Sequence, residues 1–89
     1  MKAKVLLVDD SSTVLLMEET AFKEHTHYEV VTARDGEEAV LKAKIEKPDL
    51  ILLDVVMPKM DGFAACREIR KLDHMKSVPI VMVTSRGEA

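Results

Sequence analysis

The stretch LILLDVVMPKMDG (residues 50–62) joins a continuous apolar run to a carboxylate, a proline-containing loop and the start of a helix. A short, unbroken apolar run is typical of a strand that is buried on both faces of a parallel sheet. Asp54 ends this run, and the loop that follows carries Pro58 and Gly62. The stretch therefore predicts a central strand over 49–54 that delivers a carboxylate to one edge of a sheet.

Three further segments have strand character. Residues 3–9 and 78–84 are short apolar runs, whereas residues 28–33 are shorter and more polar, as is typical of an edge strand. Segments with apolar residues at helical spacing lie between the expected strands. Strand and helix thus alternate as β-α-β-α-β-α-β. This order predicts an α/β fold with a doubly wound parallel sheet and right-handed crossovers.

The first helix is expected over 13–25, with Ser11 or Ser12 as its N-cap. Its apolar side is expected to consist of Val14, Met17, Ala21 and Phe22. Leu16 falls about 200° round from Val14 at roughly 3.6 residues per turn, so it is expected to be an exposed leucine outside that side. A partner contact through Leu16 is the alternative.

The other two helices begin at aspartates. Asp35 is expected to cap the second helix and Glu38 to close a capping box, while the helix stops before Lys47 because Pro48 follows. The third helix begins at residues 61–63 and is expected to bury three residues at helical spacing. These are Phe63, Cys66 and Ile69.

Length and composition set limits on the function. A chain of 89 residues is at most one small domain, and its net charge of -3 gives no reason to expect a nucleic-acid or membrane-surface partner. The single cysteine, Cys66, excludes an internal disulfide and suits a reducing compartment. No apolar stretch approaches the roughly 20 residues of a membrane helix. We therefore expect a cytoplasmic protein.

Three carboxylates are expected to meet at one edge of the sheet. The carboxyl ends of parallel strands share an edge, which brings Asp9 and Asp10 after the first strand close to Asp54 after the third. Thr84 and Ser85 follow the fourth strand to the same edge. Like charges so close require a cation, and an all-oxygen set favours Mg²⁺ over zinc. The alternatives are that Asp9 and Asp10 cap the first helix and that Asp54 only forms a turn.

No His and Cys set at ligand spacing competes with this site. His25, His27 and His74 are expected to be surface residues. Met57 and Met60 are expected to pack against the loop rather than bind metal, because thioethers do not suit Mg²⁺.

The acidic pair Asp9-Asp10, the aspartate of LLDVVMPKMDG (52–62) and the hydroxyl pair Thr84-Ser85 together resemble the receiver domain of two-component response regulators. The resemblance covers the whole chain. It implies a flavodoxin-like topology with strand order 2-1-3-4 and a single receiver domain over residues 1–89. It also implies a phosphoryl-accepting signalling domain rather than a metabolic enzyme.

The resemblance also implies a role for each matching residue. Asp54 would accept a phosphoryl group from the phosphohistidine of a histidine kinase or phosphotransfer protein. Asp9, Asp10, Asp54 and the backbone carbonyl of Val56 would hold Mg²⁺, with Asp10 touching the metal and Asp9 supporting it through water. Thr84 would contact the phosphoryl oxygens with Ser85 beside it. Pro58 and Gly62 would support the loop, with Pro58 fixing one dihedral and Gly62 permitting the sharp entry into the third helix.

The sequence departs from the family pattern at its end. Receiver domains have a fifth strand and a fifth helix, and a lysine at the end of that strand pairs with the phosphoryl group. Neither Lys71 nor Lys76 takes its place, since neither follows a fifth strand. An uncovered fourth strand would leave an apolar edge that can pair with another chain, so we expect oligomers through this edge.

Three other functions compete with a phosphoacceptor. A receiver-like interaction module that is not phosphorylated is the main alternative. A haloacid-dehalogenase-type phosphohydrolase would need a second aspartate where this chain has Val56. A flavodoxin-type flavin or nucleotide site is disfavoured, because Asp9 and Asp10 would repel a phosphate.

Overall fold

The computed structural model describes residues 2–83 of the chain. Thr84 and Ser85, which the sequence assigns to the site, lie outside the described residues. The strands are β1 (Lys4–Val8), β2 (Glu29–Ala33), β3 (Leu50–Asp54) and β4 (Ile80–Val83). The helices are α1 (Ser12–His25), α2 (Gly36–Glu46) and α3 (Gly62–Arg70), followed by the short 3₁₀ helix η1 (Asp73–Met75).

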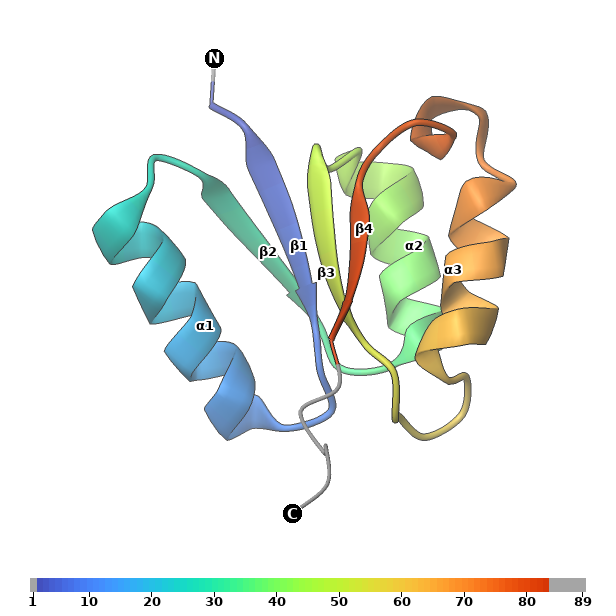
Figure 1. Ribbon diagram of the computed structural model, residues 1–89, viewed down its shortest axis with the longest axis horizontal. Helices are drawn as coiled ribbons and strands as arrows, with labels where there is room; N and C mark the ends of the chain where they lie inside the picture. The colour runs from blue at the N-terminus through green and yellow to red at the C-terminus, as the bar shows by residue number, and fades with distance from the viewer. Residues whose placement is uncertain (1, 84–89) are drawn as a thin grey trace.

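The four strands form one parallel sheet in the order β2-β1-β3-β4, as the sequence predicted. Helix α1 covers one face of this sheet, while α2 and α3 cover the other (Figure 1). The expected strands are confirmed within one or two residues of their ends. Strand β4 begins at Ile80 because the preceding Pro79 has no N–H to donate to a ladder.

The core lies on both faces of the two central strands, β1 and β3. On the side of α2 and α3, alternate strand residues such as Leu6 and Leu53 are fully buried against small helix residues such as Ala39 and Ala65. On the side of α1 the buried cluster is smaller and consists of Val5, Leu7 and Leu15. The sheet is therefore covered less completely by α1 than by the paired helices.

Helix α1 is rotated from its expected orientation. Leu15 is its buried residue, whereas Met17 is 65% exposed and Ala21 is exposed, so the expectation for these two was wrong. Phe22 packs edge-on against Tyr28 with ring centroids 5.8 Å apart, and Leu16 is exposed as expected. Four consecutive apolar residues, 14–17, start this helix, so periodicity alone does not decide which of them faces the sheet.

Helix α2 begins at its predicted cap, and α3 begins where the sequence predicted. The Asp35 carboxylate accepts the Glu38 N–H at 2.8 Å, and Asp61 caps α3 through the N–H of Ala64 at 2.9 Å. The Glu38 carboxylate accepts the N–H of Arg34 at 2.8 Å and not that of the cap residue Asp35, so the expected capping box was wrong. Lys47 then ends α2 in the left-handed region at φ 50°, just before the buried Pro48.

One expected core residue of α3 is exposed. Ile69 is buried and Cys66 is partly buried against the core, but Phe63 is 56% exposed, so that prediction was wrong. Gly62 faces the sheet, and a residue one position further lies about 100° round the helix. Phe63 therefore points away from the sheet.

Candidate metal centre

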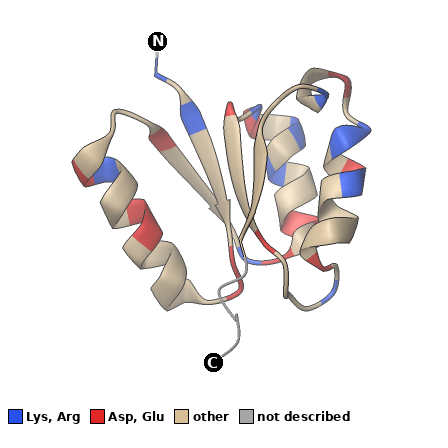
Figure 2. Ribbon diagram, in the orientation of Figure 1, with Lys and Arg blue, Asp and Glu red and all other residues tan. Residues whose placement is uncertain are grey.

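The three predicted carboxylates lie together at the carboxyl edge of the central strands. β1 and β3 are hydrogen-bonded neighbours, with Val8 opposite Leu53, so Asp9 and Asp54 leave the sheet side by side. One carboxylate oxygen from each of Asp9, Asp10 and Asp54 lies within 4.8 Å of the others. Figure 2 shows the acidic positions at these strand ends. The fold thus brings together residues 44 or more positions apart in the chain.

Asp9 and Asp54 are almost fully buried. They are 3% and 1% exposed, whereas Asp10 is partly buried. Asp9 Oδ1 accepts the N–H of Ser11 at 2.9 Å, and Asp54 Oδ1 accepts the N–H of Val56 at 3.3 Å. Ser11, not an aspartate, supplies the cap of α1 by accepting the N–H of Val14 at 3.2 Å. The reading of Asp9 and Asp10 as helix caps is therefore wrong.

The loop after Asp54 is held by backbone hydrogen bonds. The N–H of Val55 donates to the Val83 carbonyl at 3.0 Å, and the Val55 carbonyl accepts the N–H of Gly62 at 2.9 Å. Met60 donates to the Pro58 carbonyl at 2.7 Å across Lys59, whose φ is 70°. A positive φ in a residue with a side chain is uncommon and strained. The metal role of the Val56 carbonyl stays a prediction.

Gly62 supports the site for a different physical reason than expected. Its φ is not positive, so it is not needed for a special turn. A Cβ at this position would instead lie 2.4 Å from the Asp54 carbonyl oxygen and 2.8 Å from the Cα of Val55. Gly36 is similar, since its Cβ would lie 2.4 Å from the Met60 carbonyl oxygen. The two glycines let α2 and α3 pack directly on the loop that carries the site.

Two charged groups near the site were missed by sequence reasoning. Burial raises the pKa of the Glu18 carboxyl, and the charges of Asp9 and Asp54 raise it further. The Arg34 guanidinium donates to the Asp10 backbone carbonyl at 3.3 Å from the end of β2. Glu18 could have been found from its spacing of three residues from Leu15, but only if Leu15 had been identified as the sheet-facing residue.

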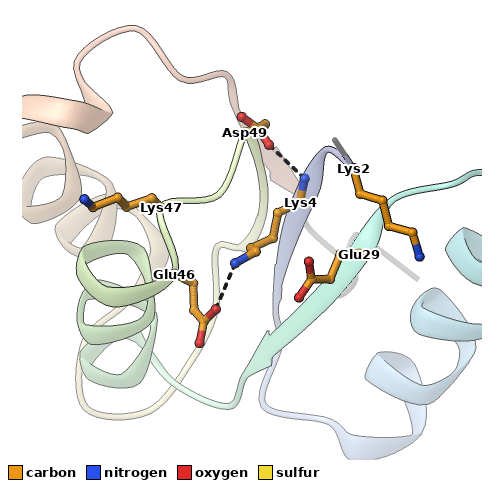
Figure 3. Close-up of a pocket in the computed structure, with 6 residues that line it drawn as sticks. All are labelled: Lys2, Lys4, Glu29, Glu46, Lys47 and Asp49. Carbon is orange, nitrogen blue, oxygen red and sulfur yellow. Dashed lines mark hydrogen bonds and ion pairs between the residues drawn. The ribbon is translucent and has the colours of Figure 1, made fainter.

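A mixed-charge hollow lies at the opposite end of the sheet (Figure 3). It is lined by Lys2, Lys4, Glu29, Glu46, Lys47 and Asp49. The Lys4 ammonium donates to Glu46 at 3.0 Å, and its backbone N–H donates to Asp49 at 2.8 Å. The hydrogen bond to Glu46 and nearby carboxylates raise the pKa of Lys4. The two hydrogen bonds of Lys4 thus join β1 to the end of α2 and to the residue before β3.

The remaining predicted residues lie where the sequence placed them. The three histidines are exposed: His25 ends α1, His27 follows it in the next loop, and His74 lies in η1. Met57 is buried and Met60 partly buried, and both pack with the core rather than toward the carboxylates as ligands. Lys71 pairs with Glu68, and Lys76 donates to the Arg70 carbonyl, so neither is at the acidic edge.

The chain is a doubly wound α/β domain with an acidic cluster at the carboxyl edge of its central strands. A family model described as response regulator receiver domain matches residues 5–89. The chain belongs to this family.

The relatives are regulators. The chain is 44% identical over 88 residues to the alkaline phosphatase synthesis transcriptional regulatory protein PhoP of Bacillus subtilis, covering 99% of this chain and 35% of that protein. The chain thus spans about a third of the length of this relative.

Solved structures show the same fold. The Vibrio cholerae chemotaxis protein CheY4 matches with a TM-score of 0.91 and 40% identity, over 99% of this chain and 72% of that chain. The receiver domain of sensor histidine kinase PA1611 from Pseudomonas aeruginosa PAO1, with a magnesium ion coordinated in its active site cleft, matches with a TM-score of 0.89 and 32% identity. That match covers 97% of this chain and 70% of the other. Among residues 2–83, no helix is long and apolar enough to cross a membrane.

Proposed function

We propose that this chain is a phosphoacceptor domain in which Asp54 receives a phosphoryl group from a phosphohistidine donor while Asp9, Asp10 and Asp54 hold Mg²⁺. The observation that carries the proposal is the approach of three carboxylates within 4.8 Å at the end of the strand that bears Asp54. Its partner would be a histidine kinase or phosphotransfer protein in the cytosol.

The residues present fit a hard divalent cation. All three side chains offer carboxylate oxygens within 4.8 Å of one another, and two of the three are buried. Mg²⁺ prefers oxygen ligands and is commonly bound through one or two carboxylates plus waters. When bound, it would neutralise charge between the carboxylates and an incoming phosphate. The magnesium seen in the PA1611 receiver domain supports the same assignment here.

Asp54 is suited to act as the nucleophile. Its carboxylate is fixed at the end of a buried strand, and one oxygen accepts the Val56 N–H. In the transfer, a carboxylate oxygen of Asp54 forms a bond to phosphorus as the phosphorus–nitrogen bond of the donor breaks. The donor ring is protonated on its other nitrogen, so the products are an acyl phosphate and a neutral histidine. Such transfers need mainly positioning and charge neutralisation from the protein.

Residues beyond the described part complete the proposal. Thr84 would donate a hydrogen bond to the new phosphoryl group, with Ser85 beside it. Because this bond exists only in the phosphorylated state, it would favour one conformation of its loop and so change a partner surface. Residues 1–89 would act as one receiver domain in this role.

Phosphoryl transfer can be tested by intact mass spectrometry after incubation with Mg²⁺ and a small-molecule phosphodonor. The wild-type chain is expected to gain one acid-stable, base-labile phosphoryl group. Asp54→Asn should gain none, while the matched control Asp49→Asn, at the other end of β3, should gain one. A wild-type chain without the adduct, or an adduct that persists in Asp54→Asn, would reject Asp54 as the acceptor.

Self-association through β4 is a second proposal about partners. In the described residues β4 pairs only with β3, and Val81 within it is 47% exposed. An uncharged, β-branched edge strand can pair with another copy. Light scattering is expected to show oligomers that increase with concentration, and a monomer at all concentrations would contradict this proposal.

A further inference from the structure

Arg34 lies beside the acidic cluster, at the end of the neighbouring strand. Val8 and Ala33 are opposite each other in the parallel ladder of β1 and β2, and the N–H of Asp9 donates to the Ala33 carbonyl at 3.1 Å. Arg34 therefore follows β2 at the same edge at which Asp9 and Asp10 follow β1. The fold thus brings a cation to the edge that carries the three carboxylates.

The Arg34 guanidinium reaches across the end of β1. It donates to the backbone carbonyl of Asp10 at 3.3 Å. Covalent geometry then places it within roughly 10 Å, about one Debye length, of the carboxylate of the same aspartate. The backbone of Arg34 is held as well, since its N–H donates to the Glu38 carboxylate at 2.8 Å. Both the backbone and the guanidinium are therefore fixed at this edge.

The charge of this guanidinium is open to an anion. Arg34 is exposed, and within residues 2–83 its guanidinium donates to a neutral carbonyl and is in no ion pair with a carboxylate. Lys59, in the loop after β3, differs because it pairs with Asp35 at 3.7 Å. An arginine stays charged at neutral pH and presents several N–H donors that match phosphate oxygens. Arg34 therefore has the chemistry of a phosphate-binding group.

We propose that Arg34 is a specificity-determining residue of the phosphoryl-transfer site, whose guanidinium favours phosphodonors that carry more negative charge. This inference rests on the proposed function, because it assumes transfer to Asp54. The three carboxylates repel an anionic donor, and this repulsion increases with the charge of the donor. A cation beside the cluster attracts the same donor in proportion to that charge, so it assists a dianion more than a monoanion.

The test compares the rates at which the chain gains its phosphoryl group from two donors, measured by intact mass at neutral pH, saturating Mg²⁺ and low salt. Acetyl phosphate is a dianion under these conditions and loses acetate as the Asp54 oxygen bonds to phosphorus. Phosphoramidate is a monoanion and loses ammonia from its protonated nitrogen. Arg34→Gln should slow the reaction of acetyl phosphate about threefold and that of phosphoramidate by a smaller factor.

Two further variants separate charge from structure. Arg34→Lys keeps the charge and should retain most of both rates. Lys44→Gln is the matched control, because it removes an exposed positive charge from the last turn of α2, and it should change neither rate. The difference between Arg34→Gln and the wild-type chain should decrease at high salt.

A merely structural role for Arg34 would slow both donors by the same factor, and this result would overturn the inference. Unchanged rates in Arg34→Gln, or equal losses in Arg34→Gln and Arg34→Lys, would overturn it as well. A failure of the proposed function looks different. In that case the wild-type chain gains no adduct from either donor, or Asp54→Asn still gains one.

Discussion

The two ends of the sheet differ in how their charged groups are arranged. At the amino end, the Lys4 ammonium and backbone N–H are bonded to Glu46 and Asp49. At the carboxyl end, like charges from three aspartates lie within 4.8 Å. Paired charges contribute modestly to stability, whereas clustered carboxylates repel one another and favour a ligand of opposite charge. The amino end contributes to structure, whereas the carboxyl end offers the oxygens that a cation would bind.

The largest expected effect is at the carboxyl end, where close backbone packing holds the repelling groups in place. Gly62→Ala would put a methyl group 2.4 Å from the Asp54 carbonyl oxygen, so the backbone has to move. The free energy of unfolding should fall by roughly 2–4 kcal/mol.

Urea denaturation would measure this loss. The control Ala64→Gly, in the same helix and away from that contact, should cost about 0.5–1 kcal/mol. Equal losses in the two variants would show that the approach of α3 to β3 is not what holds the site.

Addition of Mg²⁺ should raise the stability of the whole chain through binding at the carboxyl end. At about 100 times its Kd, a ligand that binds only the folded state stabilises by roughly 2.7 kcal/mol. The Tm of the wild-type chain should therefore rise with Mg²⁺ and return to its starting value after chelation.

Asp10→Asn should weaken this response strongly, because it removes one of the three clustered carboxylates. Asp49→Asn should respond as the wild-type chain does. A Tm increase of the same size in Asp10→Asn would place the metal outside the acidic cluster.

At the amino end, removal of a charge should lower the Tm, because the charges there are paired. Lys4→Met keeps most of the length of the side chain but removes the ion pair to Glu46. Because this pair is near the surface, the expected decrease in Tm is small, and it should become smaller still at high salt. Thermal denaturation at two salt concentrations measures it, and a Tm increase would contradict the reading of this end as structural.

The smallest effect is the pH dependence caused by Glu18. Its raised folded-state pKa means that the protonated form is favoured in the fold, so the associated stability is present below the unfolded pKa and lost as pH rises through the folded pKa. Glu18→Gln should therefore exceed the wild-type chain in Tm at neutral pH by on the order of 1–3 °C, allowing for solvent screening.

This advantage should disappear at acidic pH, where the wild-type carboxyl is neutral. Differential scanning calorimetry across this pH range measures the difference. A difference that stays constant with pH would assign it to packing instead of charge.

The local features of this fold were predictable from the sequence. Asp35 and Asp61 begin helices because a short carboxylate can accept the N–H of a residue three positions later, and both caps are present. Asp9 and Asp54 reach the same edge because their apolar runs form neighbouring parallel strands. The three site carboxylates were identified for this reason.

The rotation of each helix was less predictable. Met17 and Phe63 were expected in the core and are exposed, because the sheet contacts Leu15 and Gly62 instead. The reason for Gly62 also differed, since close packing rather than backbone freedom requires it. The positive φ of Lys59 could not be predicted from the sequence, because lysine does not favour this backbone conformation.

The order of strands and helices along the chain, most of their ends and the three clustered carboxylates follow from the sequence. These depend on interactions between residues a few positions apart, or on the rule that parallel strands share an edge. The face of α1 that meets the sheet, and with it the partial burial of Glu18, depends on the tertiary structure. The physical reason is that helix rotation is set by packing against residues distant in sequence, which local periodicity does not encode.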